Sequence, residues 1–163
     1  MSLLIWLLAA AAASATVPSL ASRRDPAPQR LTVVAHDYTF EAPDRIPAGL
    51  TTVQLINRGQ DLHHVLFVRL DEGKTLPDLV TAMKEHGPLP KWAVLVGGPN
   101  APAPGAEANA TMVLTPGTYA ILCVIPAPDG VPHVMKGMVR ELTVTGAGTP
   151  AALPAVDVVA LSL

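Results

Sequence analysis

Proline and glycine interrupt this chain so often that short elements joined by turns are favoured throughout. The 163 residues include 17 prolines and 12 glycines, while aromatic residues make up only 4%. Between these breaks lie short apolar runs, which are typical of strands linked by turns. Half of the residues are hydrophobic, so a mainly disordered chain is excluded and one ordinary core can be buried. The pattern favours an all-β fold.

The charge balance and the cysteine count exclude several classes of protein. Lys and Arg total 11 and Asp and Glu total 13, so the formal net charge is −2. Without a basic excess, nothing in the composition favours binding to nucleic acid. The single cysteine, Cys123, excludes an internal disulfide and any cysteine-rich zinc or iron–sulfur site.

The first segment is typical of a secretory signal peptide. No charged side chain precedes Arg23, and the apolar stretch is shorter than the about 20 residues that span a bilayer. We expect residues 1–21 to be a signal peptide, 22–30 a linker, 31–145 the folded domain and 146–163 an Ala/Pro-rich tail. An uncleaved N-terminal anchor is the alternative, because no Lys or Arg precedes the apolar stretch. An exported chain meets oxidants, so its lone thiol needs to be buried or bound.

Alternating apolar residues predict six or seven short strands. The candidate strands cover residues 31–40, 51–57, 63–70, 92–96, 109–114, 117–125 and 139–145. In the first of them, Val34, His36, Tyr38 and Phe40 are expected to share one face, because side chains alternate along a strand.

One helix is predicted between the strands. Thr75 is a suitable N-cap, Pro77 lies in the first turn, and Leu79 and Met83 follow at helical spacing. Several short strands with one short inserted helix predict an all-β Greek-key β-sandwich.

Two places in the sequence supply side chains that bind metals. His63 and His64 begin one predicted strand, while Cys123 ends another and is followed by His133 and Met138. A thiolate, two imidazoles and a thioether together suit copper, because the soft thiolate makes the strong bond and the thioether binds farther out. Two imidazoles and a thiolate accept both Cu(I) and Cu(II) with little rearrangement, which favours fast one-electron transfer.

The sequence resembles the cupredoxins, the type 1 or blue copper proteins, over roughly residues 36–145. The resemblance depends on the order of Cys123, His133 and Met138, with the last two residues five positions apart as in the family. Ten positions separate Cys123 from His133, which is similar to a long-ligand-loop member. The run at 130–133 resembles the type 1 site of copper nitrite reductases.

The resemblance implies a ligand set for one copper ion. That set is His63, Cys123, His133 and Met138. His63 matches the first residue of the family's His-Asn-Val triplet, and His64 stands where the family has the asparagine that braces the ligand loop. Alternation along a strand sends the two histidines to opposite faces, so both cannot easily bind one ion. His64 in place of His63, and Met135 in place of Met138, remain as alternatives.

The resemblance implies an exported carrier that moves one electron at a time as its copper cycles between Cu(I) and Cu(II). We expect a periplasmic or secreted protein with redox partner proteins or copper-handling proteins as partners, no nucleic acid, and no stable membrane insertion after signal cleavage. His133 is expected to be the ligand nearest solvent. Its neighbours Val131, Pro132 and Val134 are expected to form an apolar patch for brief docking.

Two other functions remain open at this point. The long loop and His64 are compatible with a module that binds and delivers copper without redox turnover, and a metal-free cupredoxin-like interaction domain is the third reading. An enzyme is not expected. Related oxidases and reductases place histidines beside the type 1 cysteine to reach additional coppers, whereas Leu122 and Val124 flank Cys123 here.

Overall fold

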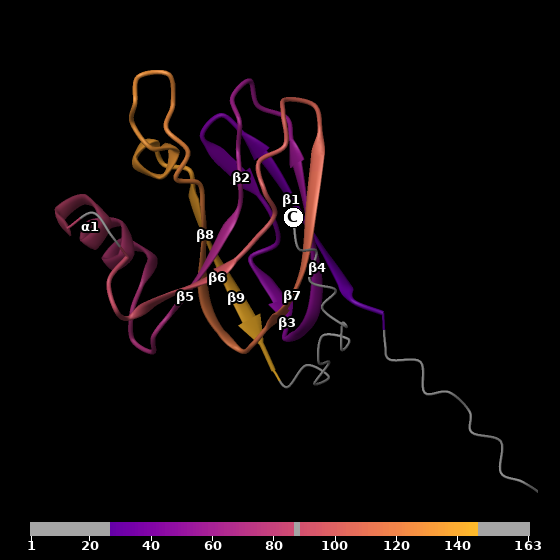
Figure 1. Cartoon of the computed structure of the whole chain (residues 1–163). Coiled ribbons are helices and arrows are strands. Elements are labelled where there is room, and N and C mark those ends of the chain that lie inside the picture. The colour runs from indigo at the N-terminus through magenta and orange to yellow at the C-terminus, as the bar shows by residue number, and fades with distance from the viewer. Residues whose placement is uncertain (1–26, 87–88, 147–163) are drawn as a thin grey trace, which may run out of the picture.

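The structure is a computed structural model that describes residues 27–86 and 89–146, and these residues form two β-sheets packed face to face (Figure 1). The four-stranded sheet has the order β2-β1-β4-β7 and the five-stranded sheet the order β3-β9-β8-β5-β6. The first sheet contains β1 (Gln29–His36), β2 (Thr39–Glu41), β4 (Gly49–Asn57) and β7 (Glu107–Leu114). The second contains β3 (Arg45–Pro47), β5 (Leu66–Leu70), β6 (Ala93–Gly97), β8 (Gly117–Leu122) and β9 (Val139–Thr145). The all-β sandwich with one inserted helix is therefore confirmed.

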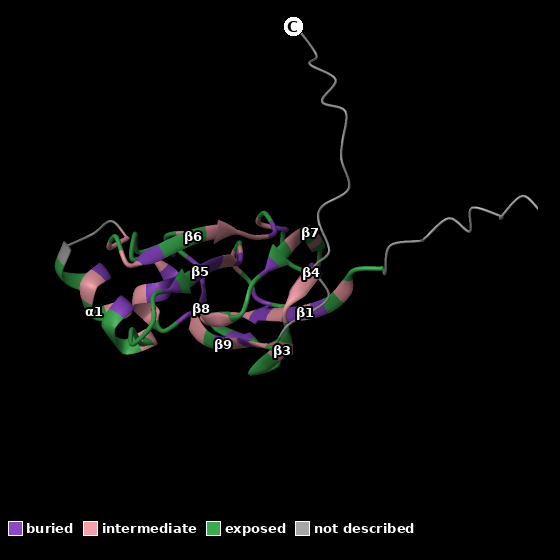
Figure 2. Cartoon of the chain, turned by 90° about the horizontal axis from the view of Figure 1, so that it is seen from below, coloured by how far each residue is buried: buried purple, intermediate pink, exposed green. Residues whose placement is uncertain are grey.

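The main core lies between the two sheets, and alternation along each strand explains its membership. It takes every second residue of the inner faces: Leu31, Val33 and Ala35 from β1, Val53 and Leu55 from β4, Phe67 from β5, Tyr119 and Ile121 from β8, and Leu142 and Val144 from β9. Figure 2 shows buried residues along the strands of both sheets. Cys123 and Met138 belong to this same cluster. The two sulfur-containing residues expected to bind the metal therefore pack in the main core.

The expectation that Val34, His36, Tyr38 and Phe40 share one face is wrong, because Phe40 pairs with Ala35 and is buried with it in the core. Val34 and His36 are only partly buried, while Leu31, Val33 and Ala35 face the core. The strand ends at His36, and the chain then turns back so that β2 pairs with β1 in antiparallel register, with Val34 opposite Glu41. The alternation that appears continuous in the sequence therefore belongs to two strands with a turn between them.

The strand expected at residues 63–70 begins later, at Leu66. The residues before it run as a loop, in which the amide of Val65 donates a hydrogen bond to the carbonyl oxygen of Pro99 at 3.5 Å. Gly98 makes this approach feasible, since its φ is +157° and a Cβ there would lie 1.9 Å from the Val65 carbonyl oxygen. His63 and His64 are thus loop residues, which frees both side chains from the alternation of a strand.

The helix α1 (Leu76–His86) covers the outer face of the five-stranded sheet. Its N-cap is Thr75, as predicted: Thr75 Oγ1 accepts a hydrogen bond from the amide of Asp78 at 3.3 Å, and the amide of Thr75 donates to Asp78 Oδ2 at 3.0 Å. Leu79 and Met83 are buried in a second apolar cluster. The other buried members are Val68, Leu70, Ala93, Ala120, Leu122 and Val134. Through Val134 this cluster supports the 3₁₀ turn η1 (His133–Lys136), which α1 contacts.

Some expectations fall outside the described residues. The predicted signal peptide at 1–21 and the tail from residue 147 onward lie there. β1 begins at Gln29, within the segment 22–30 for which a linker is expected. In the described part of the chain, no helix has the length and apolar character needed to cross a membrane.

Replacing Thr75 by alanine is expected to lower the free energy of unfolding by about 1 kcal/mol, because the first turn of α1 loses its side-chain acceptor. Urea unfolding followed by circular dichroism measures this change. Thr81→Ala is the matched control, since Thr81 is exposed in the middle of the same helix. That variant should be neutral or slightly stabilising. Equal losses in the two variants would contradict the capping role of Thr75.

Candidate metal centre

Three of the predicted ligands meet at one end of the sandwich, where the connecting loops gather (upper end of Figure 1). The ligand atoms of His63, Cys123 and His133 all lie within 4.8 Å of one another. The two Nδ1 atoms are 3.1 Å apart, and Cys123 Sγ lies 3.5 Å from Nδ1 of His133. All three residues are 0% exposed. A single ion placed among these atoms can reach all three, since metal–nitrogen and metal–sulfur bonds are about 2.0–2.3 Å long.

Backbone hydrogen bonds return His133 to Cys123 despite the ten positions between them. The amide of Val134 donates to the carbonyl oxygen of Cys123 at 2.7 Å, and the amide of His133 donates to that of Ile125 at 2.9 Å. The intervening residues form a side loop closed by a bridge between Pro126 and Pro132. The extra length of the ligand loop is therefore folded out of the way, and it does not separate the two ligands.

The structure distinguishes the two candidate methionines. Met138 is 0% exposed and packs in the same cluster as Cys123, whereas Met135 is partly buried and packs against the cluster under α1. The backbone of Met138 is also tied to both neighbours: its amide donates to the carbonyl of His133 at 3.0 Å and its carbonyl accepts from the amide of Cys123 at 3.3 Å. Met138 is thus the methionine on the same side of the sheet as the thiol.

His64 also reaches the thiol, although it lies outside the three-residue cluster. Its Nδ1 is 3.2 Å from Cys123 Sγ, and its side chain is only half-buried. His63 and His64 were expected to point to opposite faces of a strand, but both precede β5 and both have a ring nitrogen near Cys123 Sγ. The loop conformation lets a histidine side chain make that contact, where the resemblance implied an asparagine.

Burial shifts the pKa values of three side chains at the site, those of His133, His64 and Cys123. It lowers the pKa of His133, with the nearby His63 as the second cause, and it lowers the pKa of His64 in the same way, with His133 and His63 adding to the effect. Burial raises the pKa of the Cys123 thiol. The imidazoles of His133 and His64 are therefore neutral at neutral pH, and the Cys123 thiol keeps its proton until a cation displaces it.

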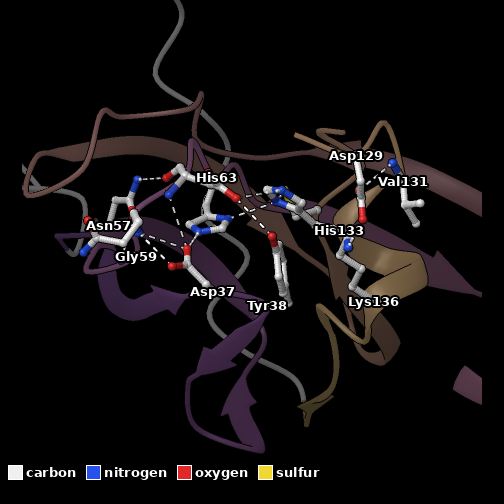
Figure 3. A network of polar contacts seen from close by, with 12 residues as sticks. Asp37, Tyr38, Asn57, Gly59, His63, Asp129, Val131, His133 and Lys136 are labelled. Carbon is white, nitrogen blue, oxygen red and sulfur yellow. Dashed lines mark hydrogen bonds and ion pairs between the residues drawn. The ribbon is translucent and has the colours of Figure 1, made fainter. Parts of the chain in front are cut away.

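The Nε2 side of the His63 ring, away from His133, contacts a residue that the sequence analysis did not identify as part of the site (Figure 3). Its Nε2 lies 2.7 Å from Oδ1 of Asp37. Partial burial raises the pKa of Asp37, but hydrogen bonds from the amide of Gln60 and from His63 outweigh it and hold the pKa below its ordinary value. Asp37 lay inside an apparently continuous strand pattern, so nothing in the sequence marked it as a partner of a loop histidine.

His133 was expected to be the ligand nearest solvent, but all four expected ligands are 0% exposed, so exposure does not distinguish them. The side chain of His133 is 0% exposed because the ring of Tyr38 packs edge-on against it, with centroids 4.9 Å apart. Oδ2 of Asp61 lies 3.8 Å from Nε2 of His133 and accepts a hydrogen bond from the Tyr38 hydroxyl at 3.1 Å. Of the expected docking residues, Val131 is exposed, Pro132 is partly buried and Val134 is buried.

The donor set fits one copper ion. A cysteine sulfur and two imidazole nitrogens surround one point, and the surrounding shell is apolar on the side of the core. Soft thiolate with imidazole is the combination that suits copper, and such an apolar shell limits access of water to the ion.

Comparison with known proteins identifies the architecture. No family model matches the chain, and no curated protein matches it either. Among solved structures, it is similar to reduced auracyanin from Roseiflexus castenholzii, with 21% identity, a TM-score of 0.51 and coverage of 74% of this chain and 100% of that one. It is also similar to auracyanin B, with 22% identity, a TM-score of 0.50 and coverage of 76% and 94%.

A further match is auracyanin A from Chloroflexus aurantiacus, described as a "blue" copper protein, with 17% identity, a TM-score of 0.48 and coverage of 73% and 100%. The two better-superposing structures show the likeness in fold. The chain has the fold of the cupredoxins, the blue copper proteins.

Proposed function

We propose that this protein is a copper protein whose copper carries one electron at a time. The observation that supports this most is the buried cluster of His63, Cys123 and His133, whose donor atoms lie within reach of one ion. Met138 is proposed as the fourth donor, because it packs in the same cluster as Cys123 and is tied to it through the backbone. When bound, copper supplies the Cu(I)/Cu(II) couple.

The protein's own contribution is to hold the donors still. Small rearrangement between oxidation states requires ligands that are fixed by packing. His63, Cys123 and His133 are all 0% exposed, and backbone hydrogen bonds also hold Cys123 and His133 in place. Complete burial also slows release of an ion, because the loops must open before a competing ligand can reach it. This favours a carrier that retains its metal over a module that delivers it, although the half-buried His64 beside the thiol keeps delivery as the second candidate.

Export is proposed on the sequence alone. The uncharged apolar segment at residues 1–21 supports a signal peptide, and a periplasmic or secreted location follows from it. A copper-bound thiolate would also protect the lone cysteine in such a compartment.

We propose electron transfer to partner proteins, with no catalysis by this chain alone. Among the described residues, the metal-binding group of three or more His, Cys, Asp or Glu is this single cluster. Leu122 and Val124 flank Cys123, so no adjacent imidazole leads to another metal. Exposed apolar side chains close in sequence to three ligands, Leu62, Val124 and Val131, supply the contact area that a brief encounter with a redox partner needs.

Adding Cu(II) to the metal-free protein is expected to produce intense visible absorption from charge transfer between the Cys123 thiolate and copper. Cys123→Ser and His63→Ala should abolish the band, since each removes a donor of the cluster. His64→Ala is the matched control and should keep it. Absorption spectra with copper content measured on the same samples provide the test.

Three results would each contradict one part of the proposal. Full copper occupancy without the band excludes a type 1 site. Loss of the band in His64→Ala with retention in His63→Ala would reverse the choice of histidine. Slow electron self-exchange combined with rapid Cu(I) transfer to an acceptor would favour delivery over electron transfer.

Met138→Leu is expected to raise the reduction potential of the copper protein, because Cu(II) loses more from the removal of a donor than Cu(I) does. Met135→Leu should leave the potential close to that of the wild type, since Met135 packs under α1. Protein-film voltammetry of both variants measures the effect. The opposite pattern would make Met135 the fourth donor.

Copper binding is expected to stabilise the fold. Free Cu(I) at a thousand times its dissociation constant should raise the free energy of unfolding by about 4 kcal/mol, because the donors meet only in the folded chain. Anaerobic urea unfolding with and without a Cu(I) chelator measures this. The same experiment on Cys123→Ser should show little stabilisation, and equal stabilisation there would place the metal elsewhere.

A further inference from the structure

Both nitrogens of the buried His63 ring have close polar neighbours. Nε2 lies 2.7 Å from Oδ1 of Asp37, and Nδ1 lies 3.1 Å from Nδ1 of His133. An ionised carboxylate can only accept a hydrogen bond, so Nε2 of His63 has to be the protonated nitrogen. A neutral imidazole has one N–H, and Nδ1 is therefore left with its lone pair facing Cys123 and His133.

Asp37 is itself fixed in direction by the loop that leads to His63. The amide of Gln60 donates to Oδ1 and Oδ2 at 3.0 and 2.9 Å, and the amide of Asp61 donates to Oδ1 at 3.3 Å. These donors also favour the ionised carboxylate. The carboxylate is therefore held against the ring by the backbone of the same segment that carries the histidine.

The loop leaves room for this contact only because residue 59 is glycine (Figure 3). A Cβ on Gly59 would lie 2.3 Å from Oδ1 of Asp37 and 2.5 Å from Nε2 of His63. The position of Gly59 is set by the fully buried Asn57, whose Oδ1 accepts the Gly59 amide at 2.9 Å and whose Nδ2 donates to the carbonyl of Asp61 at 2.8 Å.

We propose that Asp37 is a positioning residue of the metal centre, which fixes His63 as the Nε2–H tautomer with the Nδ1 lone pair directed at the metal position. This inference rests on the function proposed above. A carboxylate behind a ligand histidine sets the orientation of the ring and increases its basicity toward a metal.

A second consequence concerns His133. Two Nδ1 atoms 3.1 Å apart need one proton between them in the metal-free protein, and Nδ1 of His63 is an acceptor. His133 must then be the Nδ1–H tautomer, with an unprotonated Nε2. Nε2 of His133 has no hydrogen-bond partner among the described residues, and Oδ2 of Asp61 lies 3.8 Å away, beyond hydrogen-bond distance.

The first test uses the wild-type protein without metal. Long-range ¹H–¹⁵N NMR correlation of the histidine rings is expected to show His63 protonated at Nε2 and His133 at Nδ1. His63 protonated at Nδ1, or exchanging between tautomers, would overturn the proposal. This readout needs neither copper nor a variant, so it stays separate from the test of the proposed function.

The second test uses Asp37→Asn. We expect a 10–100-fold lower Cu(I) affinity, measured by competition with a chromophoric chelator, and loss of the single His63 tautomer in the metal-free spectrum. Asp44→Asn is the control: it removes the same charge from an exposed residue paired with Arg140 and should leave both readouts unchanged. Unchanged affinity and tautomer in a folded Asp37→Asn protein would overturn the assignment.

Gly59→Ala provides a variant that keeps the carboxylate but displaces it from the ring. The same loss of affinity and of the fixed tautomer is expected, with circular dichroism confirming that each variant folds. A folded Gly59→Ala protein with wild-type values in both readouts would contradict the proposal. If the wild type binds no copper with the expected absorption while His63 is the Nε2–H tautomer, the proposed function fails and the tautomer assignment stands.

Discussion

The hydrogen bond from the amide of Val134 to the carbonyl of Cys123 is the interaction on which the metal centre depends most. It ties the 3₁₀ turn after the side loop to the residue that directly follows strand β8, so the ten positions between Cys123 and His133 do not keep their side chains apart. The neighbouring bonds from His133 to Ile125 and from Met138 to His133 repeat this closure.

The other half of the centre comes from the opposite sheet. His63 follows β4, and its ring is oriented by Asp37 from the turn between β1 and β2 and by the glycine at position 59. Asn57 links this loop to the loop near Pro102, with hydrogen bonds of 2.8 and 3.0 Å from its Nδ2. Packing of the two sheets across the shared core then brings the two halves within bonding reach of one ion. A buried thiol and two buried imidazoles in this setting bind a cation well only because they are brought together before it arrives.

Several elements could be predicted because local patterns decide them. Thr75 with Asp78 marks the start of a helix by capping chemistry that operates over three residues, and β4, β7, β8 and β9 follow apolar alternation in segments close to those expected. Residues 31–40 were expected to form one strand whose alternate residues share a face, because alternation continues across a turn and periodicity alone does not show where a chain reverses. The contact between Tyr38 and the His133 ring could not be predicted for a related reason, because the two residues are distant in sequence.

The sequence by itself determined the kinds of donor atoms and their order, because copper's preference for thiolate, imidazole and thioether is a property of the side chains themselves. It also indicated that the elements are short, since prolines and glycines recur throughout the chain. Only the tertiary structure decided which histidine joins the cluster, which methionine shares the core with the thiol, and that Asp37 stands behind His63. Those choices depend on distances between residues that are remote along the chain, and such distances are set by the packing of the two sheets and the paths of their loops.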